Sequence, residues 1–157
     1  MIVGRHYQNA YVTRNIDQAV AEFKERADIR QLLEAEISVT LWTPHGEGIG
    51  TQKLAFLWIG DMQIELIQPG QGDVLALYRD ALPADDRLRF HHVCHRVDDW
   101  NAFLAQVDRQ PFPVALKGGT PGMLQFLYLD TRKWLGHYSE YVWMAPERWA
   151  AMGGRTA

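Results

Sequence analysis

Three histidines lie within five residues in the segment R89-F-H-H-V-C-H-R-V-D-D-W100. A neutral imidazole ring offers a nitrogen lone pair near neutral pH, which makes histidine a frequent metal ligand. If the segment is a strand, successive side chains point to opposite faces of the sheet. His92 then lies on the face opposite to His91 and His95. At most one or two of the three can therefore reach a common ion, and distant parts of the chain must supply its other ligands.

The elements that would position these side chains occur in the same order twice. In the first half, Asn15 is a plausible N-cap for a helix with an apolar stripe that includes Ile16, Val20 and Phe23. The first half is predicted to contain a strand, a helix and three strands, over residues 7–14, 16–27, 36–43, 52–60 and 62–68. The second half is predicted to repeat this order over residues 89–97, 99–109, 112–117, 122–130 and 136–143. A turn at 44–48 and a short helix at 73–81 complete the prediction.

The starts of the two halves also match in detail. The segments Q8-N-A-Y-V-T-R-N-I16 and H92-V-C-H-R-V-D-D-W100 each place a polar residue seven positions before the Asn or Asp that opens the helix. Such self-similarity indicates an internal duplication. No low-complexity linker separates the halves, so we predict one domain over residues 1–157, made of two modules at about residues 6–70 and 88–145.

Charge and composition exclude several classes of partner. The net charge is −3 and no block of Lys and Arg is present, so neither nucleic acid nor an anionic membrane is a predicted partner. No apolar run approaches the ~20 residues that span a bilayer. The N-terminus lacks the layout of a secretory signal, and the single cysteine, Cys94, cannot form an internal disulfide. These features predict a cytoplasmic protein.

The paired β-α-β-β-β halves resemble the vicinal oxygen chelate superfamily, which includes glyoxalase I, methylmalonyl-CoA epimerase and bleomycin-resistance-like proteins. The resemblance covers about residues 6–143. It implies an α+β fold in which two β-α-β-β-β modules form a cupped mixed sheet around one cavity, with the helices outside. It also implies a divalent metal ion, held by one side chain from the first strand and one from the last strand of each half.

The family pattern selects four positions in this chain. The first-strand position, seven residues before the helix start, is Gln8 in the first half and His92 in the second. The last strand of the first half commonly reads Glu-Leu with a proline shortly after, as in E65-L-I-Q-P69. The last strand of the second half commonly reads Asp, then Gly, then Glu four residues later, and D130-T-R-K-W-L-G136-H-Y-S-E140 fits with two extra residues before the glycine. The resemblance therefore implies metal ligation by Gln8, Glu65, His92 and Glu140.

The first of these positions departs from the commonest family pattern. Many members have histidine where this chain has Gln8, although some glyoxalase I enzymes use glutamine. Glutamine argues against the ring-cleaving, iron-dependent dioxygenases of the superfamily, which need two His and one carboxylate. His6 lies two residues away and would share the face of Gln8 in a regular strand, so a register shift would exchange the two.

This ligand set suggests a class of reaction. One amide oxygen, two carboxylates and one imidazole suit a divalent cation, with Zn, Ni, Co, Mn and Mg all open as its identity. Such an ion can polarise a carbonyl and stabilise an enolate, while Glu140 or Glu65 removes the adjacent C–H proton as general base. Each glutamate alone would be interpreted as a solvent-facing strand residue; only their joint positions indicate a site.

We therefore predict a metal-dependent lyase or isomerase (an epimerase, for example) that acts on a small carbonyl substrate, with Glu140 and Glu65 as catalytic residues and a homodimer as its assembly. The alternative is a metal-free small-molecule-binding protein of the same fold. A dioxygenase ranks third because of Gln8.

Overall fold

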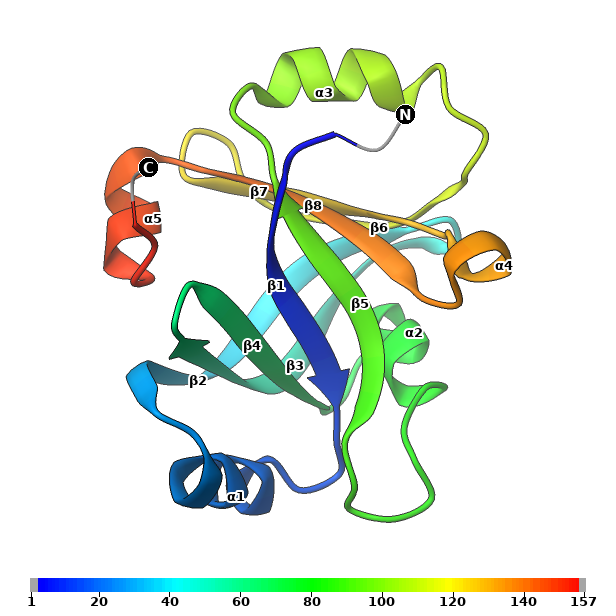
Figure 1. Ribbon diagram of the computed structural model, residues 1–157. Helices are drawn as coiled ribbons and strands as arrows, with labels where there is room; N and C mark the ends of the chain where they lie inside the picture. The colour runs from blue at the N-terminus through cyan, green and yellow to red at the C-terminus, as the bar shows by residue number, and fades with distance from the viewer. Residues whose placement is uncertain (1–2, 156–157) are drawn as a thin grey trace.

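The computed structural model describes residues 3–155 (Figure 1). Its eight strands form a closed barrel in the order β1-β4-β3-β2-β6-β7-β8-β5. The strands are β1 (Arg5–Val12), β2 (Ile29–Thr43), β3 (Gly46–Ile59), β4 (Met62–Pro69), β5 (Arg89–Arg96), β6 (Val114–Thr120), β7 (Leu124–Leu129) and β8 (Tyr138–Met144). The helices are α1 (Ile16–Arg26), the 3-10 helix η1 (Asp73–Leu75), α2 (Ala76–Arg79), α3 (Trp100–Val107), α4 (Arg132–Leu135) and α5 (Pro146–Ala151).

The pairing of the strands joins two four-stranded halves along two seams. Within the halves, β1 runs parallel to β4 and β5 runs parallel to β8, while the other neighbours are antiparallel. The halves meet where β1 and β5 pair antiparallel over most of their length. The second seam is short, because β2 and β6 pair only at Leu41–Gly118 and Trp42–Lys117. The predicted α+β, glyoxalase-like fold class is confirmed.

The two longest helices lie outside the barrel, as expected (Figure 1). The Asn15 side chain accepts a hydrogen bond from the backbone N–H of Gln18, which caps α1. Asp99 caps α3 in the same way by accepting from the N–H of Ala102. Each helix buries an apolar stripe against the outer face of its own half, with Val20 of α1 packed among Leu57 and Leu66.

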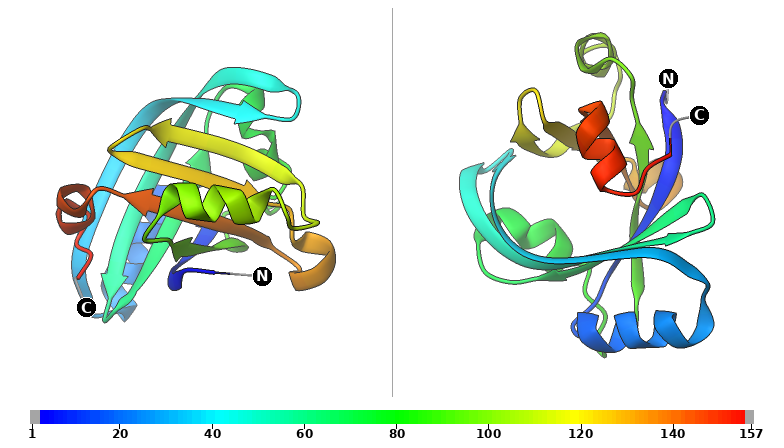
Figure 2. Two further views of the ribbon diagram at one scale, coloured as in Figure 1. Left: turned by 90° about the horizontal axis from the view of Figure 1, so that it is seen from above. Right: turned by 90° about the vertical axis from the view of Figure 1, so that its left-hand side faces the viewer.

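The connection between the halves enters the barrel. In the side view of Figure 2, β2 and β3 form a long curved hairpin, and α2 lies inside its curve. Val74, Leu75 and Tyr78 from η1 and α2 are buried in the largest apolar cluster, beside Leu41 and Leu54. The glycines of β3 allow this close approach, because a Cβ atom at Gly50 would lie 2.6 Å from Cγ of Leu75.

Several predicted boundaries were wrong for identifiable reasons. Strand β2 begins at Ile29 rather than at residue 36, because residues 29–35, IRQLLEA, do not alternate between polar and apolar side chains and so do not predict a strand. Strand β3 begins at Gly46 rather than at residue 52, because its glycines serve packing and the turn contains only Pro44 and His45. The predicted helix 73–81 is divided into η1 and α2, and α4 was not predicted. The remaining boundaries differ from the prediction by at most three residues.

Among residues 3–155, no helix has both the length and the apolar character needed to cross a bilayer.

We predict that Gly72 is needed to seat η1 in the barrel. Its φ is +109°, and a Cβ there would collide with the backbone oxygen of Ile49. Gly72→Ala should therefore lower the free energy of unfolding by about 2–3 kcal/mol, because both backbone strain and a steric clash result. Gly60→Ala is the matched control, since Gly60 has φ +59° with no atom near its Cβ position and should cost about 1 kcal/mol. Urea unfolding measures both values, and equal losses would show that the contact with β3 does not matter.

Candidate metal and catalytic site

The candidate site is built from two rows of side chains on the inner face of four adjacent strands. The register of β4, β1, β5 and β8 aligns one row of Gln63, Gln8, Cys94 and Glu140. It aligns a second row of Glu65, Ala10, His92 and Tyr138. All eight residues are buried. Ala10 separates Glu65 from His92 in the second row, and its small side chain leaves the space in which they meet.

Three of the four predicted ligands converge. Nε2 of His92 lies 3.0 Å from a carboxylate oxygen of Glu140 and 3.4 Å from one of Glu65. The potential ligand atoms of the three residues lie within 4.8 Å of one another. This arrangement could hold one metal ion, since two carboxylates and an imidazole are common ligands of divalent cations.

Gln8, the fourth predicted ligand, lies in the same row as Glu140. Its side-chain nitrogen donates a hydrogen bond to Oε1 of Gln63 at 2.7 Å. Its own Oε1 is buried and has no hydrogen-bond partner within residues 3–155. A buried carbonyl oxygen without a partner is costly, and a cation would satisfy it.

The alternative first ligand, His6, lies on the outside of the barrel. The register between β1 and β5 shifts between His6 and Gln8, so that Tyr7 is an extra residue. A β-bulge of this kind turns the following side chains to the other face. His6 is exposed, and its Nε2 lies 2.9 Å from the side-chain oxygen of Asn9. The exchange of His6 for Gln8 is therefore not supported.

A second register shift corrects the prediction for His91. Between Ala10 and Tyr11 the partner residue changes from His92 to Phe90, which leaves His91 as an extra residue in β5. The strict alternation that placed His91 opposite to His92 fails at this bulge. The two rings are in contact instead, with 2.9 Å between their Nδ1 atoms. His95 does lie on the outer face, where its ring stacks on Tyr141.

The hydrogen bonds of His91 define the protonation of His92. Nε2 of His91 lies 3.2 Å from the backbone oxygen of Leu77, which can only accept, so this nitrogen carries a proton. Burial, and then the charge of His92, lower the pKa of His91 from 6.5 to about 3, so the ring is neutral and its Nδ1 accepts. His92 must then donate from its own Nδ1. Its Nε2, which faces the two carboxylates, is left to bind either a proton or a metal ion.

The pKa values of His92 and Glu65 depend on each other. Burial disfavours the charged form of His92, but hydrogen bonds with Glu140 and Glu65 outweigh it and raise the pKa from 6.5 to about 9. Burial raises the pKa of Glu65, the hydrogen bond from His92 opposes this rise, and the charge of Glu140 adds to it. Without a metal ion, the site therefore retains a proton on His92 at neutral pH.

Comparison with known protein families identifies the superfamily of the chain. The sequence model of the Glyoxalase/Bleomycin resistance protein/Dioxygenase superfamily matches residues 7–128. The chain belongs to this superfamily. The resemblance that the sequence suggested is thereby confirmed. The comparison with functionally curated proteins found no match.

Solved structures of the same fold include several methylmalonyl-CoA epimerases. The enzyme from Mycobacterium tuberculosis is 16% identical with a TM-score of 0.61, over 96% of this chain and 97% of that one. A methylmalonyl-CoA epimerase in complex with methylmalonyl-CoA and NH4+ is 15% identical with a TM-score of 0.62, over 92% and 97%. A Streptomyces coelicolor methylmalonyl-CoA epimerase in complex with 2-nitronate-propionyl-CoA is 16% identical with a TM-score of 0.60, over 92% and 97%. At these identities the likeness shows the fold.

Beyond the four predicted residues, this superfamily member has other polar groups at the site. The Tyr128 hydroxyl lies 3.3 Å from Nε2 of His92 and accepts a hydrogen bond from Tyr78 at 3.0 Å. Gln63 could have been predicted from the sequence as a residue of the site, because it precedes Glu65 by two residues and so lies on the same face of the strand. Nothing in the sequence pattern predicts Tyr128 as a residue of the site, since only the pairing of β7 with β8 places it opposite Glu140.

Cys94 lies between Gln8 and Glu140 but is not a nucleophile. Burial, and then the charge of Glu140, raise the pKa of its thiol well above the usual value. A thiol that stays protonated at neutral pH is inert.

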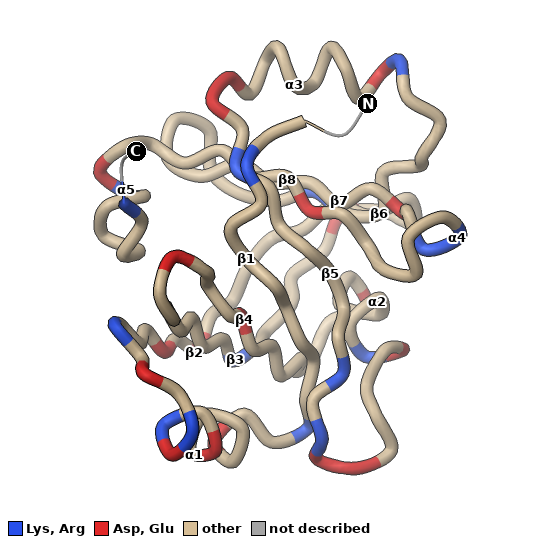
Figure 3. Tube along the Cα trace, viewed as in Figure 1, with Lys and Arg blue, Asp and Glu red and all other residues tan. Residues whose placement is uncertain are grey.

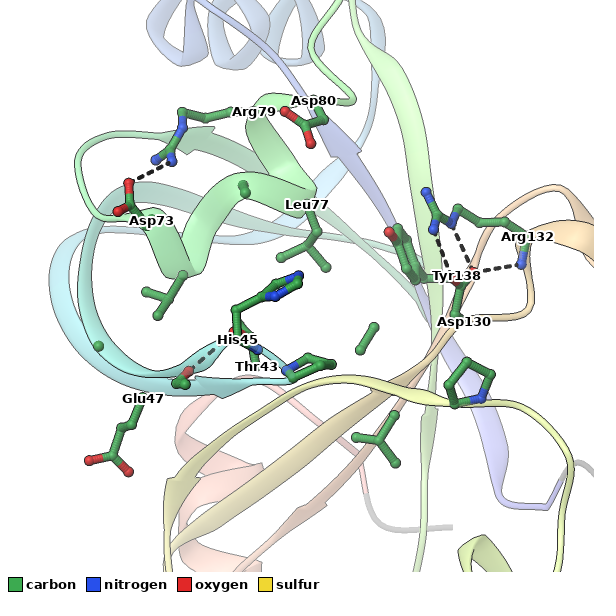
Figure 4. A pocket seen from close by; sticks show the side chains of 18 residues that line it. Thr43, His45, Glu47, Asp73, Leu77, Arg79, Asp80, Asp130, Arg132 and Tyr138 are labelled. Carbon is green, nitrogen blue, oxygen red and sulfur yellow. Dashed lines mark hydrogen bonds and ion pairs between the residues drawn. The ribbon is translucent and has the colours of Figure 1, made fainter.

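A cavity opens beside this site, at the tip of the β2–β3 hairpin (Figure 4). It has a volume of about 850 Å³ and is bounded by His45, Leu77 and Tyr138, among others. Tyr138 is the neighbour of His92 across β8 and β5, and its ring stacks on that of His91 at 5.1 Å. None of Gln8, Glu65, His92 and Glu140 lines this cavity.

We predict that the stability of the metal-free protein falls at alkaline pH. His92 has a folded-state pKa of about 9, above its ordinary value of 6.5. Its stabilising proton is thus fully present below about pH 6.5 and is lost as the pH rises through 9. The loss should reach about 3 kcal/mol in chelator-treated protein, measured by urea unfolding at a series of pH values.

Glu140→Gln provides the comparison for this measurement. It removes one of the two carboxylates that raise the pKa of His92, so the loss of stability should move to lower pH. Identical pH profiles for the two proteins would rule out His92 as the titrating group.

Proposed function

We propose that this protein is a divalent-metal-dependent isomerase that transfers a proton at the carbon next to a carbonyl group of a small substrate. Gln8, Glu65, His92 and Glu140 are the proposed metal ligands. The observation that supports this most directly is the convergence of two buried carboxylates on Nε2 of one buried imidazole.

The residues present fit a divalent cation. Two carboxylates supply two negative charges, His92 offers one nitrogen, and the unpartnered oxygen of Gln8 offers a neutral fourth donor. Zn, Ni, Co, Mn and Mg all accept such mixed ligands. When bound, the ion would supply Lewis-acid polarisation of the substrate carbonyl, which acidifies the neighbouring C–H bond.

Glu65 and Glu140 are the groups proposed to move the proton. They approach His92 from β4 and from β8, on either side of β1 and β5. A reaction that inverts a stereocentre needs one group to remove the proton and another to return it on the opposite face. Glu140 is the proposed base, and the pKa of Glu65, raised by burial, suits it to hold and return a proton.

Other side chains of the site orient the reacting groups. His91 fixes the ring of His92 through Nδ1, as partners behind metal-bound histidines commonly do. Burial raises the pKa of Tyr128 well above its usual value, so this residue stays a neutral hydrogen-bond donor beside His92. The ring of Tyr128 packs edge-on against that of His92, with 4.8 Å between the ring centres.

The structural neighbours suggest a substrate class to test first. Methylmalonyl-CoA epimerases share this fold, and one is solved in complex with methylmalonyl-CoA. Thioesters with an acidic α-carbon are therefore the first candidates, ahead of 2-oxo aldehydes. A lyase would use the same carboxylates, whereas a ring-cleaving dioxygenase is disfavoured because the cluster holds a single imidazole.

A second candidate is a metal-free binding protein. The cavity of about 850 Å³ favours it, because this volume suits a small organic molecule and neither glutamate lines the cavity. Protonated His92 would then neutralise part of the charge of the two carboxylates. Metal binding distinguishes the two candidates.

We predict that the chelator-treated chain binds one divalent ion in isothermal titration with Mn²⁺ or Zn²⁺. Glu65→Gln should weaken the binding at least ~100-fold, because a charged ligand is replaced by a neutral one. Glu36→Gln is the matched control, since Glu36 is exposed on β2 and should leave the affinity unchanged. Absence of binding in the wild-type protein would favour the binding-protein candidate.

We predict that Glu140→Gln lowers catalysed proton exchange by ~10²–10⁴-fold, because the variant keeps an oxygen ligand but loses the base. Thioesters and 2-oxo aldehydes, screened for deuterium uptake in heavy water, identify a substrate for the measurement. The loss should appear mainly in kcat. Wild-type exchange in a variant that still binds metal would limit Glu140 to the role of ligand.

A further inference from the structure

A second cavity, of about 390 Å³, lies at the opposite end of the barrel from the cavity at the β2–β3 tip. It is lined by the start of β1, the ends of β3 and β5, and helix α5. Its charged and aromatic lining residues are Arg5, His6, Tyr7, Arg30, Trp58, Asp61, Arg96, Trp149 and Arg155. Neither the family match nor the proposed reaction gives these residues a role.

The cavity has more positive than negative charge. Arg5 pairs with Asp98 at 2.9 Å, and Arg155 pairs with Asp61 at 3.2 Å. Arg30 and Arg96 form no ion pair within residues 3–155. Four guanidinium groups against two carboxylates leave two positive charges without a carboxylate partner.

The strand register brings two of the four guanidinium groups together, those of Arg5 and Arg96. Arg5 and Arg96 are directly opposite partners on β1 and β5, where Figure 3 shows the two basic segments side by side. Like charges in this position repel each other. Burial, and then the charge of Arg5, lower the pKa of Arg96, and its Nε is buried without a hydrogen-bond partner among the described residues. An anion at this point would relieve both costs.

The two unpaired arginines are held in place by tryptophans. The guanidinium of Arg96 lies 4.4 Å from the ring centre of Trp149, and that of Arg30 lies 5.1 Å from that of Trp58. Arg30 is further fixed by donating to the backbone oxygen of Gly153 at 2.9 Å. Stacking leaves the edges of a guanidinium free to donate in its plane, which is the geometry that oxyanions accept.

The aromatic side of the cavity is rigid. Trp149 packs edge-on against Tyr7 at 4.9 Å and against Trp58 at 5.8 Å. Both indole nitrogens are occupied, since Trp58 donates to the backbone oxygen of Met152 and Trp149 donates to that of Arg155. A ligand would thus meet a fixed apolar wall on one side and guanidinium groups on the other, in a volume that suits a small molecule.

We propose that this cavity binds the phosphate or carboxylate group of a small organic anion, with Arg30 and Arg96 as its main contacts. The inference does not depend on the proposed metal chemistry. The cavity does adjoin the other site, because Tyr7 precedes Gln8 and Trp58 is the strand partner of Gln63.

The test is titration of the full chain with pyrophosphate and, separately, with malonate, at constant ionic strength. At least one should bind with a single site per chain and shift the indole N–H signals of Trp58 and Trp149 in NMR spectra. A response to pyrophosphate alone identifies a phosphate site, and a response to malonate identifies a carboxylate site. Binding of neither at millimolar concentration overturns the proposal.

Charge-removing variants locate the binding. Arg30→Gln and Arg96→Gln should each weaken it at least ~10-fold, since each removes a charged hydrogen-bond donor. Arg109→Gln is the control, because Arg109 is exposed and lines neither cavity. Arg96→Gln removes the stack on Trp149 and could disturb folding. Arg30 is exposed, so Arg30→Gln tests the proposal without this risk. Equal weakening in all three variants would show non-specific attraction and overturn the proposal.

Glu140→Gln separates this proposal from the proposed function. It should leave anion binding intact, because Glu140 lines neither cavity. Absence of metal binding in the wild-type chain, with anion binding retained, would contradict only the proposed function.

Discussion

The structure depends on one electrostatic constraint: two carboxylates are buried within hydrogen-bonding distance of the same imidazole nitrogen. Removing one charge from water is costly, and two like charges at such short range repel each other strongly. The folded state must relieve this repulsion with a proton, either on His92 or on a carboxylate, or with a divalent cation. The raised pKa values of His92 and Glu65 express this requirement. Such a cluster could hold a metal ion.

The barrel satisfies the constraint through its strand order. Parallel pairing of β1 with β4 and of β5 with β8, joined by the antiparallel β1–β5 seam, brings residues from four strands into two level rows. Ala10 in the centre leaves room for the converging groups. The bulge at His91 then places a second imidazole against His92, and this ring is anchored on Leu77 of the inserted helix α2. The packing of η1 and α2 inside the hairpin is therefore linked to the orientation of the central histidine.

Much of the site follows from periodicity in the sequence. The repeated seven-residue spacing singled out Gln8 and His92, and the family resemblance added Glu65 and Glu140; the structure buries all four. His6 and His91 could not be placed in this way, because a single inserted residue in a bulge reverses the alternation. Helix α4 accounts for the two extra residues before Gly136, but four residues without a side-chain cap give no recognisable helix pattern. The arginine cavity could not be predicted either, since its residues come from five separate segments that only the closed barrel brings together.

The most direct test of the central claim is to locate a metal ion in crystals of the chain soaked in Mn²⁺, by anomalous scattering. We predict one strong peak inside the barrel, ~2.0–2.3 Å from His92 Nε2, from carboxylate oxygens of Glu65 and Glu140, and from Oε1 of Gln8. The His92 nitrogen should then no longer make hydrogen bonds to the two carboxylates. A cluster that keeps its direct His92–Glu140 contact, with manganese bound elsewhere or not at all, would contradict the account.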